Sequence, residues 1–249
     1  MVVVCKPWIK FVAELDGSMA VIVRYCAIDR LPRGLFIRQV NLAAGDTMAS
    51  HSEHWDAVFS IGDDRQLGWY EHDVSQTLKF FKHLKLNADS QIFLAGAGTS
   101  SLVDELLKTG SHLILNDISA LALAKLTSRV GAGNYQMLQH DLGMPLTQVQ
   151  LVDLWVDRAV LHFLLEESAI TQYFDNLKAS VKSDGYVLLA EFSKAGVEEC
   201  AGLPVHRYSL EEMQARLGKG FRLIESEDYV FISPHGQKRL YVYALFQRW

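Results

Sequence analysis

Residues Gln91–Ser101 read QIFLAGAGTSS, and this stretch decides the fold. The apolar run Ile92–Ala95 gives way to Gly96-Ala97-Gly98, after which helix-forming residues resume at Leu102. This pattern is typical of a buried parallel strand that turns through glycines into a helix, an arrangement that holds nucleotide-like ligands. Glycine suits such a turn because it tolerates a positive φ and because a Cβ would hold a ligand away from the backbone. A Gly-x-Gly pair alone is a weak signal, so its meaning depends on the residues that follow.

Three further apolar runs are each followed by an aspartate. In an open α/β sheet, ligands bind outside the carboxyl ends of the strands, so we expect the four turns to meet at one crevice. For any single aspartate, a helix N-cap is an equally good explanation. All three together, in register with a Gly-x-Gly turn, favour a shared ligand site. The aspartates are Asp117 after residues 112–116, Asp141 after residues 135–139 and His140, and Asp157 after residues 152–156.

The composition narrows the class of protein. The chain has 249 residues and 49% hydrophobic content, which is enough to bury one large core. Its formal net charge is −5. An acidic chain without a Lys/Arg-rich run argues against a nucleic-acid partner. No apolar run approaches the roughly 20 residues of a membrane helix. Cys5, Cys26 and Cys200 show neither a disulfide nor a zinc spacing. We therefore expect a soluble cytoplasmic protein without a metal, and take a monomer as the working hypothesis.

Residues 1–47 differ in pattern from the rest of the chain. They contain candidate strands at 9–15 and 19–27, joined by the turn-forming pair Asp16-Gly17. Met48 stands just ahead of a far more regular region. Residues 1–47 are therefore either an accessory hairpin or sequence upstream of a translation start at Met48. We treat 1–47 as an N-terminal extension of open status and 48–249 as one domain.

From residue 50 onward, helices and strands alternate, which favours a parallel sheet with covering helices. The last two strands, 221–231 and 240–247, are joined only by Ser233–Gly236, so they must pair antiparallel because no helical crossover fits. We predict an α/β fold with a doubly wound, seven-stranded sheet of five parallel strands plus a C-terminal antiparallel hairpin, and helices on both faces. The other expected elements are a helix from residue 50, helices 75–84, 101–109, 119–130, 165–182 and 210–217, and strands 91–95, 112–116, 135–139, 152–156 and 186–192.

With these motifs in this order, residues 50–249 resemble the class I S-adenosylmethionine-dependent methyltransferases. Residues 152–163 are similar to the thiopurine-methyltransferase-like branch, and Gly68-Trp69-Tyr70 is similar to an element with which small bacterial methyltransferases cover the cofactor. Leu94 departs from the pattern, because the superfamily has an acidic residue there that contacts the methionine amine, and Ser100 replaces a third glycine. The matching motifs are Leu94–Thr99, Asn116–Ser119, His140-Asp141 and Asp157-Arg158.

The resemblance implies S-adenosylmethionine as the cofactor and suggests which residues contact it. Asp117 would bind the ribose hydroxyls, and Ile118 would pack on the adenine. Asp141 would accept from the adenine amino group, with the Leu142 amide beside it, and Asp157 would start the loop alongside the reactive methyl. The remaining cofactor contacts would come from Ala95, Gly96, Gly98 and Thr99 along the methionine end and from Trp69 as a cover.

The expected acceptor side consists of Trp69, Tyr70, Arg158 and His162. An aromatic face near a sulfonium gains about 0.5–2 kcal/mol of cation–π energy, although Trp69 and Tyr70 could equally pack a helix onto the sheet. An amine acceptor would need a base, and His162 has suitable acidity, with Asp157 as the second expected catalytic residue. The structural alternative for His162 is a packed residue whose ring is satisfied by a backbone carbonyl.

These observations predict a methyltransferase that acts on a small-molecule nucleophile such as a thiol, a selenol or an amine. Two alternatives stay open: a protein-lysine methyltransferase, and a module that binds S-adenosylmethionine but has lost catalysis, for which Leu94 and Ser100 are the motivation. The sequence does not identify the acceptor, because specificity in such a fold is carried by loops added to a common sheet.

Overall fold

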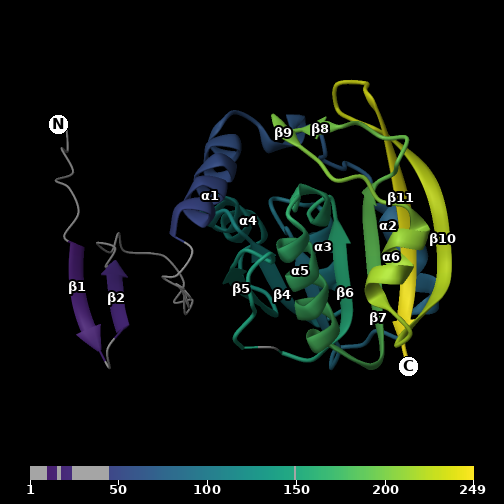
Figure 1. Cartoon of the computed structure of the whole chain (residues 1–249), viewed down its shortest axis with the longest axis horizontal. Coiled ribbons are helices and arrows are strands. Elements are labelled where there is room, and N and C mark those ends of the chain that lie inside the picture. Colours follow the sequence, from purple (N-terminus) through teal and green to yellow (C-terminus); the bar gives the residue numbers. More distant parts are fainter. Residues whose placement is uncertain (1–9, 16–17, 24–44, 149) are drawn as a thin grey trace.

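The computed structural model describes residues 10–15, 18–23, 45–148 and 150–249, with side chains from residue 51 onward (Figure 1). Its main feature is a seven-stranded sheet with the strand order β10-β11-β7-β6-β3-β4-β5. The strands are β3 (Gln91–Ala95), β4 (His112–Asp117), β5 (Tyr135–Gln139), β6 (Val152–Arg158), β7 (Val181–Phe192), β10 (Phe221–Ile232) and β11 (Lys238–Arg248).

The pairing of these strands confirms the predicted sheet. The strands β5, β4, β3, β6 and β7 pair parallel with one another, and β11 pairs antiparallel with both β7 and β10. The hairpin thus enters the sheet with its second strand next to β7 and its first strand at the edge. Both faces of the central strands are buried, as expected for parallel strands that helices cover on both sides.

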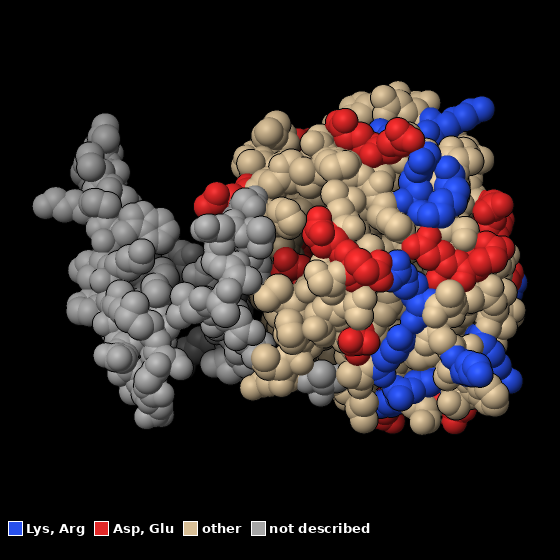
Figure 2. All heavy atoms as spheres, in the orientation of Figure 1, with Lys and Arg blue, Asp and Glu red and all other residues tan. Residues whose placement is uncertain are grey.

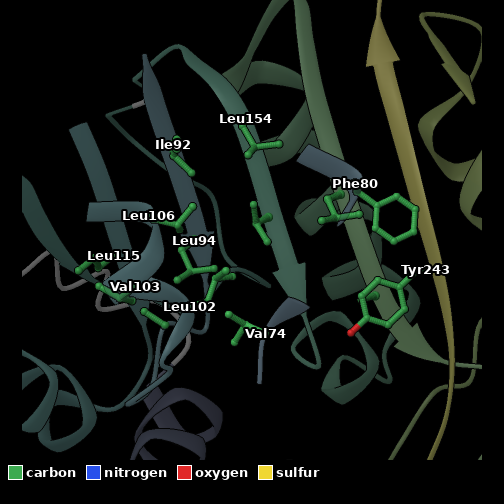
Figure 3. Packing of buried hydrophobic residues seen from close by; sticks show 14 of the residues in the cluster. Val74, Phe80, Ile92, Leu94, Leu102, Val103, Leu106, Leu115, Leu154 and Tyr243 are labelled. Carbon is green, nitrogen blue, oxygen red and sulfur yellow. The ribbon is translucent and has the colours of Figure 1, made fainter. Parts of the chain in front are cut away.

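Two hydrophobic clusters hold the helices to the sheet. On one face, residues of α3 (Leu102–Lys108) and α4 (Ala120–Val130) pack with α2 (Ser75–Leu78) and the 3-10 helix η2 (Lys79–His83). Figure 3 shows this cluster around Leu94 and Leu154, with Phe80 next to Tyr243. On the other face, α5 (Glu167–Ser180) and α6 (Leu210–Leu217) cover Phe93 and Trp155, whose rings stack 3.9 Å apart. The predicted helices on both faces are confirmed.

The segment predicted as helix 75–84 is instead a short α-helix continued by a 3-10 helix. A 3-10 helix has three residues per turn, which puts Lys79 and Lys82 on one side, towards β10. There Lys79 pairs with Glu227 and Lys82 with Glu225. The buried Phe80 ring stacks on Tyr243 at 5.7 Å. Tertiary contacts with the hairpin therefore override the α-helical pattern in this segment.

The segment Lys182–Gly185 contains Ser-Asp-Gly, a sequence typical of a turn, and it lies within β7, where it forms an irregularity. The register with β6 moves from Val152↔Val181 to Leu154↔Tyr186, so the strand accommodates extra residues there. Asp184 adopts φ +63°, the left-handed conformation that a tight turn requires. The turn is therefore present, but regular pairing continues on both sides of it.

Of the N-terminal extension, β1 (Lys10–Leu15) and β2 (Ser18–Val23) are described and pair antiparallel. The predicted turn at Asp16-Gly17, together with Cys5 and Cys26, lies outside the described residues. Helix α1 (Gly45–Ser60) begins before Met48. The division of the chain at residue 48 stays a prediction.

Two surface properties can be stated for the described part of the chain. On the face drawn in Figure 2, acidic and basic side chains lie interspersed rather than in one basic field. Among the described helices, none has both the length and the apolar character needed to cross a membrane.

Candidate active site

A cavity of about 850 Å³ lies where the predicted strand ends meet. Its lining includes the turn after β3, the residues that follow β4 and β5, and the end of β6, so the expected common crevice exists. This volume is in the range of small-molecule and cofactor sites. Among the residues predicted as site residues, those that line the cavity are Trp69, Tyr70, Ala95, Gly96, Gly98, Thr99, Asp117, Ile118, Asp141, Leu142, Arg158 and His162.

The glycine turn after β3 can be formed only by glycine at its first position. Gly96 has φ +57°, and a Cβ there would lie 2.0 Å from Cγ2 of Val160. Gly98 has φ +49°, and its Cβ would lie 3.3 Å from Cζ of Phe59. The turn is thus closed on one side by the segment after β6 and on the other by α1, which explains the sequence requirement without invoking a ligand.

Asp117 joins this turn to the end of β4. Its Oδ2 accepts a hydrogen bond from the Gly98 N–H at 2.8 Å, and its Oδ1 accepts from the Ser119 N–H at 2.8 Å. Burial raises the pKa of Asp117 to about 6. The N-cap of α4 is Ser119, whose hydroxyl accepts from the Ala122 N–H, so helix capping does not account for Asp117. Each carboxylate oxygen accepts more than one hydrogen bond, which leaves Asp117 capacity for a ligand hydroxyl.

Asp141 likewise caps no helix. Its Oδ1 accepts from the Gly143 N–H at 2.8 Å within the turn after β5, and the side chain is partly exposed at the cavity. Leu142 beside it is buried. A carboxylate next to an apolar side chain can bind an amino group on a flat ring.

Asp157 does not line the cavity, contrary to the prediction that it starts a loop alongside the reactive methyl. The side chain has no exposed surface and points towards α5, where Tyr173 Oη donates to Oδ2 at 2.6 Å. Its Oδ1 accepts from the Val160 N–H at 3.1 Å. Burial and the neighbouring Glu191 raise the pKa of Asp157 well above its usual value. The carboxyl thus supports the Val160 segment, which packs on Gly96. Alternate residues of a strand point to opposite faces, which is why Asp157 faces α5 while the next residue, Arg158, lines the cavity.

His162, which lines the cavity, forms a buried pair with Glu191 behind it. Neither side chain is exposed, and His162 Nδ1 lies 2.7 Å from Glu191 Oε2, although without the alignment of a hydrogen bond. The imidazole stacks on Phe192 at 4.4 Å, and burial lowers its pKa to about 3, so it is neutral. Burial raises the pKa of Glu191 to about 8. The alternative explanation of His162, a packed residue whose ring binds a backbone carbonyl, does not hold, because neither ring nitrogen has a hydrogen-bond partner among the described residues.

The opposite wall of the cavity is aromatic. The Trp55 ring of α1 lies edge-to-face against Trp69, with the ring centroids 5.6 Å apart, and against Phe163, with the centroids 4.8 Å apart. The ring centroids of Phe59 and Trp69 lie 6.3 Å apart. All four rings line the cavity. Trp69 therefore both packs α1 onto the body of the domain and faces the cavity, so the two explanations of this residue are compatible.

Sequence reasoning missed several residues of the site. Glu191 could have been found as a lone carboxylate in the apolar run Val187–Phe192. Two polar residues of the segment after β9 do not line the cavity: His206 pairs with Glu212 at 2.6 Å, and Arg207 pairs with Glu198. Among the side chains that the structure describes, those of residues 51–148 and 150–249, no cluster of His, Cys, Asp and Glu could hold a metal ion. The missed residues that line the cavity include Trp55, Phe59, Glu71, Val160, Phe163 and Cys200.

No protein-family model matches the chain, and no curated protein matches its sequence. Solved structures do match. An S-adenosylmethionine-dependent methyltransferase from Anabaena variabilis superposes with a TM-score of 0.66 at 13% identity, over 88% of this chain and 100% of that one. The 1,6-didemethyltoxoflavin-N1-methyltransferase of Burkholderia thailandensis gives 0.61 at 17% identity, over 90% and 98%. The N-methyltransferase NodS of Bradyrhizobium japonicum, solved with S-adenosylhomocysteine, gives 0.59 at 14% identity, over 82% and 99%.

These similarities establish the class of fold. The chain has the class I S-adenosylmethionine-dependent methyltransferase fold, with the parallel strands and the inserted antiparallel strand described above. The predicted resemblance to this superfamily is thereby confirmed at the level of the fold.

Proposed function

We propose that the protein is an enzyme that transfers a methyl group from S-adenosylmethionine to a small-molecule nucleophile. One observation carries the proposal: Gly96, Asp117 and Asp141, from three separate strand ends, line a single cavity that continues to Arg158 and His162. The cavity thus has one end with the chemistry of a nucleoside site and another end with room for a second molecule.

The residues present fit the proposed cofactor. The partly free carboxylate of Asp117 can accept from ribose hydroxyls, and Asp141 can accept from an adenine amino group. Ile118 and the buried Leu142 offer apolar surface for the ring, while the backbone of Gly96–Thr99 faces the cavity. The departure at Ser100 does not block the site, because its hydroxyl accepts from the Leu102 N–H at the start of α3.

The chemistry requires alignment and exclusion of water more than acid–base groups. The bound cofactor would supply an electrophilic methyl on a sulfonium, to which the acceptor's lone pair bonds while the sulfur–carbon pair stays on sulfur. Holding two reactants in line contributes about 7–11 kcal/mol in favourable cases. The aromatic wall of Trp55, Trp69 and Phe163 excludes water and stabilises positive charge. His162 is neutral and, with a pKa lowered to about 3, too weak a base to take a proton, so we propose that it orients the acceptor through a ring nitrogen while the acceptor's proton leaves to solvent.

The nature of the acceptor is part of the proposal. The cavity is enclosed by α1 on one side and by the short strands β8 (Glu199–Cys200) and β9 (Leu203–Pro204) on another, which favours a small molecule over a protein side chain. Two similar structures are N-methyltransferases by name, which supports an amine-type nitrogen among thiol, selenol and amine acceptors. We further propose a cytoplasmic monomer that does not bind nucleic acid, in line with the net charge of −5.

Calorimetric titration of the purified protein with S-adenosylmethionine tests the cofactor assignment. We expect saturable binding that Asp117→Ala abolishes and that Asp89→Ala, at an exposed loop position outside the cavity, leaves unchanged. Absence of binding to the wild-type protein contradicts the proposal.

Methyl-labelled cofactor incubated with a cell extract then separates the acceptor classes. Label in the small-molecule fraction is the expected result. Label in protein would favour the lysine methyltransferase alternative, and binding without any transfer would favour the catalytically silent module.

A further inference from the structure

Arg158 is a buried cation that lines the acceptor end of the cavity. Its side chain is 9% exposed, and its guanidinium lies over the rings of Phe231 and Tyr241, at 4.8 and 4.9 Å from their centroids. Nη1 donates to the Trp69 carbonyl oxygen at 2.9 Å, and Nε donates to Tyr243 Oη at 3.1 Å. These contacts hold the guanidinium plane in one orientation.

One nitrogen of Arg158 is left without a partner. Nη2 is buried and makes no hydrogen bond to any described residue. A buried N–H without an acceptor costs free energy, so such groups are normally paired with protein, water or ligand. Because Arg158 lines the cavity, a molecule bound there is the natural source of the missing acceptor atom.

The charge of Arg158 is already balanced by protein. Glu71, only 6% exposed, places Oε2 3.1 Å from Nε of Arg158 and also lines the cavity. Burial raises the pKa of Glu71, and the Arg158 charge opposes that rise. Burial favours the neutral form of the other titratable groups near Arg158: the pKa values of Tyr241, Tyr243 and Cys200 are raised, that of Glu191 is raised to about 8, and that of His162 is lowered to about 3. The acceptor end therefore carries a hydrogen-bond donor but no net charge among the described groups.

The shape of this end is set by flat and apolar side chains. Trp69 and Phe163, each in edge-to-face contact with Trp55, line the cavity together with Leu203 and Pro204 of β9. Aromatic side chains favour stacked or edge-to-face contact with another ring. An isolated charge placed here would lose its hydration without gaining a counter-ion, which is unfavourable.

Resting on the proposed methyltransferase function, we propose that the acceptor is an uncharged, flat heteroaromatic molecule whose carbonyl oxygen or ring nitrogen accepts from Arg158 Nη2. Glu71 is then a specificity residue, because its carboxylate cancels the charge that would otherwise attract an anion. Methylation at a ring N–H forms the nitrogen–methyl bond, breaks the sulfur–methyl bond with its electron pair left on sulfur, and releases the ring proton to solvent.

Probe molecules of one shape and different charge test this inference. The probes are 2-quinolinone, 2-naphthoate and 2-naphthylmethylammonium, titrated by calorimetry into protein saturated with S-adenosylhomocysteine. We expect 2-quinolinone to bind the wild type best, and Arg158→Met to weaken it about 10- to 100-fold. Arg207→Met, at an arginine paired with Glu198 outside the cavity, is the matched control and leaves binding unchanged.

Glu71→Gln provides a second, nearly isosteric test that does not remove the guanidinium. It leaves the Arg158 charge unbalanced, so we expect 2-naphthoate to gain affinity while 2-quinolinone changes little. This variant also decides the matter if Arg158→Met does not fold, as judged by circular dichroism.

Several results would overturn the inference. These are preferential binding of 2-naphthoate or of the ammonium probe by the wild type, an unchanged 2-quinolinone affinity in Arg158→Met, and no gain of 2-naphthoate in Glu71→Gln. A loss of S-adenosylhomocysteine affinity in Arg158→Met would assign Nη2 to the cofactor instead. Failure of the wild type to bind S-adenosylhomocysteine at all would contradict the proposed function itself, which this titration series measures first.

Discussion

The two ends of the cavity are built on different principles. At the end beside β3, β4 and β5, backbone turns and two carboxylates come from short motifs that directly follow each strand. At the end beside β6 and β7, the site is assembled from side chains far apart in sequence, such as Trp55, Glu71 and Arg158. The first end uses hydrogen-bonding groups of the chain itself, whereas the second uses a buried ion pair, a buried carboxyl–imidazole pair and an aromatic wall.

This difference separates what the fold supplies from what is particular to this chain. Turns at the carboxyl ends of parallel strands occur wherever this sheet occurs. Buried charges are retained only where other groups satisfy them, so they are sensitive to every neighbour. We therefore expect changes at the first end to affect the turn and cofactor binding, and changes at the second end to affect acceptor binding, methyl transfer and the free energy of the buried charges.

The largest effect is expected for Gly96→Ala. The added Cβ would lie 2.0 Å from Val160 Cγ2, and the turn would force the alanine to adopt φ +57°. We therefore expect a loss of about 2–4 kcal/mol in the free energy of unfolding. Gly131→Ala is the control, because Gly131 also has a positive φ but has nothing within 4 Å of the added carbon. Because Gly131 has ψ −148°, a conformation that essentially only glycine adopts, the loss in Gly131→Ala should be about 1–3 kcal/mol from the backbone alone. Equal losses in urea titrations would show that the Val160 contact does not constrain the turn.

Cofactor binding should depend on the ionisation of Asp117. The pKa of this carboxyl is raised to about 6, and only the ionised form accepts from two hydroxyls without donating. We expect the affinity for S-adenosylmethionine to fall as the pH drops below about 6 and to become independent of pH, but about 10- to 100-fold weaker, in Asp117→Asn. Calorimetry from pH 5 to pH 8 measures this, with binding enthalpies corrected for the buffer. An identical pH profile in the variant would remove Asp117 from the site.

The stability of the protein should fall as the pH rises above 6.5. The folded-state pKa of Glu191 is about 8, raised from 4.5, so the folded state holds a proton that the unfolded state has lost. His162, with a pKa lowered to about 3, contributes the opposite slope, but only below its unfolded value of 6.5. We therefore expect a decline of up to about 2 kcal/mol between pH 6.5 and pH 8.

Glu191→Gln should flatten this decline, while Glu53→Gln at an exposed position of α1 should not. Urea unfolding at three pH values measures the slope. A slope that is the same in Glu191→Gln and in the wild type would mean that Glu191 is already ionised in the folded protein.

The smallest effect is expected at the aromatic wall. Trp69→Leu removes a face that stabilises positive charge, so we expect methyl transfer to fall by a factor that corresponds to about 0.5–2 kcal/mol, with cofactor affinity nearly unchanged. Trp69→Phe keeps an aromatic ring and should recover part of the loss. A Trp69→Leu enzyme with full activity would leave Trp69 only the role of packing against Trp55 and Phe59.

The local pattern of the chain was sufficient for most elements and for the cofactor end. Ser209 with Glu212 three residues later is a capping pattern that the sequence alone shows, and the Ser209 hydroxyl accepts from the Glu212 N–H at the start of α6. Local signals of this kind depend on residues a few positions apart. The segment 75–84 was misjudged because it packs on the hairpin, far away in sequence, through the Phe80 ring on Tyr243 and the ion pairs with β10.

Asp157 shows the limit of motif reasoning within the site. Its position at the end of β6 was predicted, yet its side chain turns away from the cavity to Tyr173. A strand alternates its side chains between two faces, and the motif does not state which face looks onto the ligand. Glu191 was overlooked for the complementary reason, since one carboxylate in an apolar strand shows no partner until the sheet is assembled.

The sequence by itself determined the alternation of strands and helices, the glycine turn at Gly96 and the acidic strand ends at Asp117 and Asp141, because each depends on backbone conformation and short spacing. Only the tertiary structure decided that Arg158 and Glu71 form a buried ion pair, that His162 lies against Glu191 and that Trp55 completes the wall. Burial and pairing of charge are properties of the whole packed domain, because the free energy of a charged group depends on every atom that replaces its water.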